Sequence, residues 1–151
     1  MITLKELALF LHVLFACVWV GGMLALVLVV APTLRSSKDR EKLFLNLGKR
    51  LSFYGTFLSL TGLFITGLIN IHYTIGFSQL IDFSNPYVST LLHKLLAFGG
   101  VVILSLSHDL YFGKRAYEKR LNLYIARLLG FLNLILSLLI VFFAIKLRFG
   151  G

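Results

Sequence analysis

Four histidines are the residues whose type and position point most directly to chemistry: His12, His72, His93 and His108. Each lies within, or at the edge of, an apolar stretch long enough to cross a bilayer. An ionisable side chain inside such a stretch is costly and usually serves a function. Neutral imidazole is the commonest protein ligand for metal ions, and two imidazoles from facing helices can bind the iron of a haem.

The composition predicts an integral membrane protein. The chain has 151 residues, of which 58% are hydrophobic and 14% charged, and its mean hydropathy is +0.91. Soluble domains are about half apolar and about a quarter charged. The apolar segments are each about 20 residues or longer and lack the short alternating pattern of a membrane barrel. We therefore expect an all-α fold, a single four-helix transmembrane domain over 1–151, with helices near 6–32, 51–75, 87–112 and 122–146.

The distribution of basic residues predicts the orientation of these helices. Of the 15 Lys and Arg residues, 11 lie in or next to the connections after the first and third helices. They are Arg35, Lys38, Arg40, Lys42, Lys49, Arg50, Lys114, Arg115, Lys119, Arg120 and Arg127. The positive-inside rule places both basic loops in the cytoplasm and both termini on the outer, periplasmic side. We expect a multi-pass protein of the cytoplasmic (inner) membrane, whose partner is the lipid bilayer and not nucleic acid.

Antiparallel helices allow the depths of the histidines to be compared. His12 and His93 are expected about five residues inside the outer ends of their helices, roughly 7–8 Å deep. His72 lies somewhat shallower, and His108 follows His93 at roughly 22 Å along the helix axis. The sequence therefore predicts one haem b in the outer half of the helix bundle. His12 is the first ligand and His72 or His93 the second, and a second haem at His108 is an alternative.

Small, aromatic and basic residues near the histidines favour a bound haem. Gly62 and Gly100 belong to small-residue stripes on the second and third helices, and such stripes let a helix or a flat ligand approach closely. Trp19 shares a helical face with His12. Lys94 is placed to pair with a haem propionate. A simpler interpretation also stands, in which the stripes only pack helices.

Two of the histidines have a simpler interpretation as well. His72, beside Tyr73, is equally compatible with a solvated helix end, and His108, beside Asp109, with a hydrogen-bonded helix terminus. Copper is less well supported than haem because copper sites favour Cys and Met beside His. The single cysteine, Cys17, faces roughly away from His12 on the same helix.

Several short motifs resemble a known family. The first helix holds His12-Val13, Trp19-Val20-Gly21-Gly22, Pro32 and Arg35, the second Thr66-Gly67-Leu68, and the third His93-Lys94-Leu95-Leu96 with His108 further on. These residues resemble the CopD/HemJ-like small membrane proteins over nearly the whole chain. The resemblance implies a four-helix bundle and, for the HemJ side, a b-type haem with His12 as ligand. It also implies protoporphyrinogen oxidation with Lys94 functional, whereas the CopD side implies copper transport.

These observations together predict a b-type haem-binding membrane cytochrome. It would transfer single electrons between the haem and either membrane quinone or a small periplasmic redox partner such as superoxide. The alternatives are a HemJ-like protoporphyrinogen oxidase, a CopD-like copper transport or resistance protein, and a purely structural partner subunit. The separation of Pro32 from Arg35 counts against porphyrinogen oxidation, because the family has an adjacent Pro-Arg pair. The chain is also compatible with a homo-oligomer.

Overall fold

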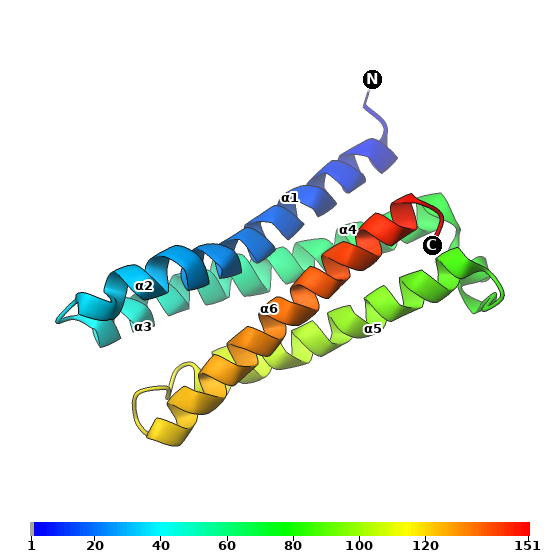
Figure 1. The fold of residues 1–151 in the computed structure, drawn as a ribbon. Coiled ribbons are helices and arrows are strands. Elements are labelled where there is room, and N and C mark those ends of the chain that lie inside the picture. Colours follow the sequence, from blue (N-terminus) through cyan, green and yellow to red (C-terminus); the bar gives the residue numbers. More distant parts are fainter. Residues whose placement is uncertain (1) are drawn as a thin grey trace.

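The computed structural model describes residues 2–151, and Figure 1 shows them as long helices joined by short connections. Four helices are long and apolar enough to cross a membrane, which confirms the expected all-α fold and the expected multi-pass membrane protein. These spans are Leu4–Ser36, Arg40–Thr74, Pro86–Phe112 and Arg120–Arg148.

The spans are built from shorter helical elements. The first contains α1 (Leu4–Ala25), η1 (Leu26–Val30), α2 (Ala31–Thr33) and η2 (Leu34–Ser36), and the second contains α3 (Arg40–Arg50), η3 (Leu51–Leu58) and α4 (Ser59–Thr74). A 3₁₀ turn, η4 (Phe77–Ile81), leads to the third span, which consists of α5 (Pro86–Ser107) and η5 (His108–Phe112). The fourth span is the single helix α6 (Arg120–Arg148).

Local sequence signals explain where two of the spans begin. The Thr3 hydroxyl accepts from the Glu6 backbone N–H at 3.3 Å, and the Glu6 carboxylate accepts from the Thr3 N–H at 2.8 Å, which forms a capping box before α1. The Asn85 side chain accepts from the Tyr87 N–H at 2.9 Å, and Pro86 occupies the first position of α5.

The second span begins earlier than the sequence predicts. We expected a loop up to about residue 50, but residues 40–50 form α3, which continues into the apolar part of the span. The Arg, Glu, Lys and Leu residues of α3 are good helix formers, and charge does not prevent a helix in water. A 35-residue helix is about 52 Å long. Because the hydrocarbon core is only about 30 Å thick, the polar α3 must project beyond it.

Three π-helical segments interrupt the spans. They are η1, η3 and η5, and each lies in the half of its span that faces the two basic connections. In the first span, Pro32 has no N–H to donate, and one residue later the Thr33 hydroxyl donates to the Val29 carbonyl at 2.6 Å. In the third span, the Gly113 N–H donates to the His108 carbonyl at 2.6 Å. The second of these bonds keeps a backbone group satisfied at the end of a π segment.

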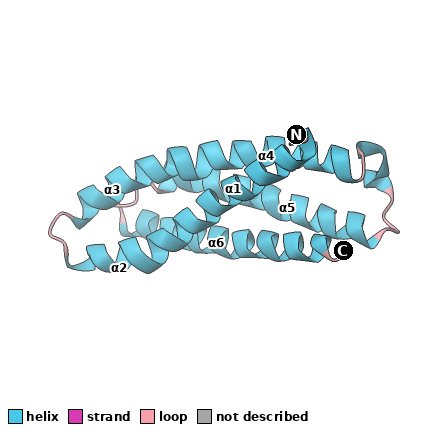
Figure 2. Cartoon of the chain, turned by 90° about the horizontal axis from the view of Figure 1, so that it is seen from above, coloured by secondary structure: helices cyan, strands magenta, loops and turns pink. Residues whose placement is uncertain are grey.

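The four spans form two antiparallel hairpins. α1 packs along α4, and α5 packs along α6, whereas contacts between the hairpins are fewer. Figures 1 and 2 show both termini at one end of the bundle, hereafter the terminus end, and the α2–α3 and η5–α6 connections at the other, the basic end. All four spans contribute to a central core, whose buried residues are Trp19, Leu60, Leu63, Val101 and Ile140.

Buried polar groups join the two hairpins near this core. The Asn133 amide on α6 donates to the Ser105 hydroxyl on α5 at 2.8 Å and lies 3.9 Å from the Met23 sulfur on α1. Asn133 and Ser105 are both buried. Amide and hydroxyl side chains commonly bridge helices in membranes, where each hydrogen bond contributes about 0.6–2 kcal/mol. This contact therefore fixes α5, α6 and α1 relative to one another.

The contact between Phe15 and Gly62 gives a testable packing prediction. A Cβ at Gly62 would lie 2.5 Å from the Phe15 ring, whereas nothing lies within 4 Å of a Cβ at Gly99. Gly62→Ala is expected to destabilise the protein by about 1–3 kcal/mol because the ring must move out of a packed seam. Gly99→Ala, the matched control, is expected to leave the stability within about 1 kcal/mol of the parent. Denaturant titration in detergent measures both, and equal stabilities would contradict the packing argument.

Candidate functional site

His12 lies on α1 and is held by a hydrogen bond to the neighbouring helix α4. Its Nδ1 atom is 2.8 Å from the Thr66 hydroxyl oxygen. That hydroxyl has one proton, which it donates to the Gly62 carbonyl at 2.6 Å. Thr66 therefore accepts from His12, which places the imidazole proton on Nδ1 and leaves a lone pair on Nε2. This is the tautomer of a metal-ligating histidine whose second nitrogen is held by the protein.

Glycine leaves space for the His12 ring on α4. A Cβ at Gly67 would lie 3.4 Å from His12 Cε1, so a side chain at this position would press against the imidazole. Thr66 itself is 5% exposed, and His12 is only partly exposed. The ring is thus fixed by a buried hydroxyl and a close backbone, both from the helix with which α1 packs.

His93 on α5 has the same tautomer for a simpler reason. Its Nδ1 atom is 2.7 Å from the Ser89 carbonyl oxygen, one turn earlier on the helix. A carbonyl can only accept, so Nδ1 carries the proton and Nε2 again carries the lone pair. The His93 side chain is exposed, and its ring lies 6.1 Å from the Phe143 ring of α6, centroid to centroid. Two histidines on different hairpins therefore offer Nε2 as a ligand.

The two remaining histidines lie in different surroundings. His72 is exposed near the end of α4, with its ring 5.2 Å from the Tyr73 ring and 5.8 Å from the Phe77 ring. His108 opens η5 at the basic end, where its Nδ1 is 2.7 Å from an Asp109 carboxylate oxygen. The hydroxyl groups of Ser52 and Thr56, on η3, lie beside the same carboxylate.

Helix bounds give the depth of each histidine below the terminus end. His12 is eight residues from Leu4 and His93 is seven residues from Pro86, or about 12 and 10 Å of helical rise. His72 is two residues from Thr74, about 3 Å. His12 and His93 are therefore at nearly the same distance from their helix ends, and His72 is nearer to the surface.

The other residues singled out from the sequence have separate places. Gly62 accommodates the Phe15 ring, Gly100 packs near Leu136 of α6, and Trp19 is a buried core residue with 3% exposure. In the structure these three residues pack helices together. Lys94 follows His93 on α5, is partly buried, and lies close enough for its charge to act on the His12 ring.

Lys94 has no counter-ion in the described part of the chain. Within residues 2–151 the only ion pair is that of His108 with Asp109, at the other end of the bundle. An unpaired ammonium group inside a span is costly and favours a negatively charged ligand group. The same range contains no group of three or more His, Cys, Asp or Glu side chains arranged to hold a metal ion.

Thr66 is the site residue whose role the sequence did not predict. The sequence identifies Thr66 only as part of a short motif, whereas its hydroxyl fixes the tautomer of His12. The available signal was its place in the Thr66-Gly67-Leu68 motif of the second helix. In this motif, Thr66 is hydrogen-bonded to His12, and Gly67 leaves the space that the His12 ring occupies.

Comparison with known proteins identifies a full-length relative. No family model and no solved structure matches the chain. A protein of Aquifex aeolicus (strain VF5), described as uncharacterized, is 48% identical over 151 residues, which cover 99% of this chain and 99% of that protein. The chain belongs to the same family as this Aquifex aeolicus protein.

Proposed function

We propose that this protein is a b-type haem-binding membrane cytochrome that transfers single electrons. The observation that carries the proposal is the matched state of His12 and His93. Each imidazole donates from Nδ1 to a fixed acceptor, and each keeps a lone pair on Nε2. Haem-ligating and metal-ligating histidines have this arrangement, because the hydrogen bond fixes the ring and raises its basicity as a ligand.

The donor set fits a haem. His12 and His93 would hold the iron from two hairpins, and two imidazole ligands favour electron transfer over oxygen binding. The haem would supply a centre that gains and loses one electron. Lys94, beside His93 and without a carboxylate partner in residues 2–151, would compensate the charge of a propionate. His72, nearer to the helix end, is the alternative second ligand.

The positive-inside rule supports an orientation with the basic end in the cytoplasm. The α2–α3 region and the η5–α6 connection carry most of the basic residues, and both lie at the basic end (Figure 2). The candidate haem site would then lie in the periplasmic half of the inner membrane. In that position it could exchange electrons with membrane quinone or with a small periplasmic partner such as superoxide.

Removal of the Thr66 hydroxyl tests the hydrogen bond on which the proposal rests. Thr66→Val keeps the shape of the side chain and removes the acceptor for His12 Nδ1. Loss of such a second partner typically lowers metal affinity about 10–100-fold. We expect this decrease in a haem titration of the apoprotein, while Thr66→Ser, the control, keeps nearly the parental affinity. Equal affinities in the two variants would show that Thr66 does not support a ligand.

A HemJ-like protoporphyrinogen oxidase is the second candidate function. It is favoured by the resemblance of His12, the Thr66-Gly67-Leu68 motif and Lys94 to that group, and by the position of Lys94 beside the candidate site. The purified protein, incubated anaerobically with protoporphyrinogen and a quinone acceptor, distinguishes the two functions. Bound haem without turnover favours the cytochrome, and formation of protoporphyrin favours the oxidase.

A further inference from the structure

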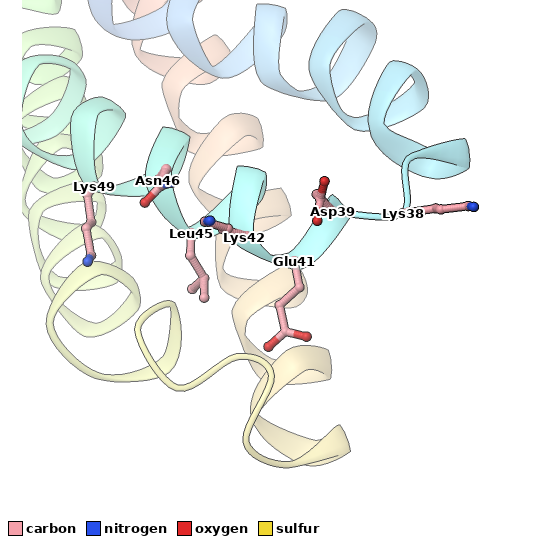
Figure 3. Close-up of a pocket in the computed structure, with 7 residues that line it drawn as sticks. All are labelled: Lys38, Asp39, Glu41, Lys42, Leu45, Asn46 and Lys49. Atoms are coloured by element: carbon pink, nitrogen blue, oxygen red, sulfur yellow. The ribbon is translucent and has the colours of Figure 1, made fainter.

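A hollow at the basic end lies outside the candidate haem site. Its volume is about 400 Å³, and it is lined by Lys38, Asp39, Glu41, Lys42, Leu45, Asn46 and Lys49. Figure 3 shows these residues on α3 and on the turn that precedes it. Lys42, Asn46 and Lys49 are spaced by four and three residues, so they share one face of α3.

The lysines of this hollow are available to bind an anion. Asp39 and Glu41 also line it, but no ion pair joins them to a lysine, since the only ion pair in residues 2–151 is His108–Asp109. Lys42, Asn46 and Lys49 are all exposed. Each lysine brings three N–H donors, and the Asn46 amide adds two more. Three lysines and two carboxylates line the hollow, so its net charge is positive, and no ion pair within the described residues occupies the donors of Lys42 and Lys49.

The hollow also lies at the boundary of the apolar part of the span. α3 is polar, whereas the segment that follows it, η3, has the apolar sequence LSFYGTFL. Lys49 is therefore close to the level where the hydrocarbon region begins, and Lys42 lies about 10 Å further out along the helix. Phospholipid phosphates occupy this level, and Leu45 offers an apolar surface between the two lysines.

We propose that this face of α3 binds the phosphate-bearing headgroup of an anionic phospholipid from the leaflet at the basic end. Lys42 and Lys49 bind oxygens of the headgroup, and Asn46 donates to a glycerol or phosphate oxygen. A basic pocket beside a transmembrane helix is a known form of lipid recognition. A lipid is favoured over a soluble phosphate because it is already concentrated at this depth.

A lipid-binding measurement on the full chain tests this inference. The protein is placed in phosphatidylcholine nanodiscs, phosphatidylglycerol is titrated in, and native mass spectrometry counts the bound lipids. The test variant is K42Q/K49Q, and the control is K114Q/K119Q, which removes the same charge from the other basic connection. Because each surface lysine contributes about fivefold in affinity for anionic lipid, the test variant is expected to bind about 25-fold more weakly.

The outcomes separate the hollow from general surface attraction. Weaker binding of phosphatidylglycerol in K42Q/K49Q alone, with the control close to the parent, supports the site. An equal loss of lipid affinity in both double variants overturns the proposed site. Unchanged lipid affinity in both variants overturns it as well. Inorganic phosphate at millimolar concentration is a separate arm, and complete displacement of the lipid by phosphate overturns the lipid assignment. If K42Q/K49Q fails to fold, Asn46→Asp places a negative charge between the lysines and is expected to weaken binding in the same way.

This inference does not depend on the haem. The hollow and the candidate haem site lie at opposite ends of the bundle. The absorption spectrum reports on the haem site, and lipid binding reports on the hollow. A colourless protein that still selects phosphatidylglycerol would contradict the proposed function alone. A haem-containing protein without lipid preference would contradict the headgroup site alone.

Discussion

Replacing His12 with Ala is expected to remove nearly all haem from the purified protein. His12 is the most firmly fixed imidazole of the proposed site, since Thr66 and Gly67 of the adjacent helix hold its ring. Loss of an iron ligand should cost more than the 10–100-fold in affinity that is typical of a second-sphere partner. The ratio of haem to protein, measured by absorption after purification from haem-replete cells, checks this expectation.

His108→Ala is the matched control for this result. His108 is also a partly exposed histidine inside a span, but it lies at the basic end and pairs with Asp109. We expect the control to keep the parental haem content. Full occupancy in the His12→Ala protein would exclude His12 as the main ligand, and loss in both variants would indicate a general effect on folding.

Replacing His93 with Ala is expected to change the spin state of the iron. The proposed site would hold the iron through His12 and His93, so the variant would keep one imidazole, and a bound haem would become high-spin instead of low-spin. Electron paramagnetic resonance and the visible spectrum report this change directly. Haem affinity should fall as well, although less than in His12→Ala, because His93 is exposed whereas His12 is partly buried and hydrogen-bonded to Thr66 of α4.

His72→Ala distinguishes the two candidates for the second ligand. His72 lies about 9 Å nearer to its helix end than His12 does to its own, and its ring packs against aromatic side chains. We expect the His72→Ala protein to remain low-spin. A high-spin spectrum in His72→Ala together with a low-spin spectrum in His93→Ala would reverse the assignment.

The fold could be predicted from the sequence because the bilayer restricts the choice of structure. Four long apolar segments leave little alternative to four helices, since backbone groups in lipid must be satisfied within a helix or a closed barrel. The start of the second span could not be predicted in the same way. Hydropathy marks where a helix is apolar, whereas α3 is a charged helix that continues the span into water.

The candidate site could be predicted only in outline. The similar depths of His12 and His93 follow from counting residues along antiparallel helices, and the helix bounds agree with that count. The Thr66 contact joins residues 54 positions apart and depends on the rotation of α1 against α4, which spacing alone does not fix. The surroundings of Gly62 could not be predicted from spacing either. The space beside this glycine, which we expected to admit a helix or a flat ligand, holds the Phe15 ring.

The absorption spectrum of the purified, detergent-solubilised protein tests the central claim most directly. The protein is expressed in haem-replete cells, and its spectrum is recorded in the oxidised and dithionite-reduced states. The proposed site predicts the bands of a low-spin b haem, at about one haem per chain, which sharpen on reduction. A folded, colourless protein that takes up no added haem would contradict the assignment of His12 and His93 as haem ligands.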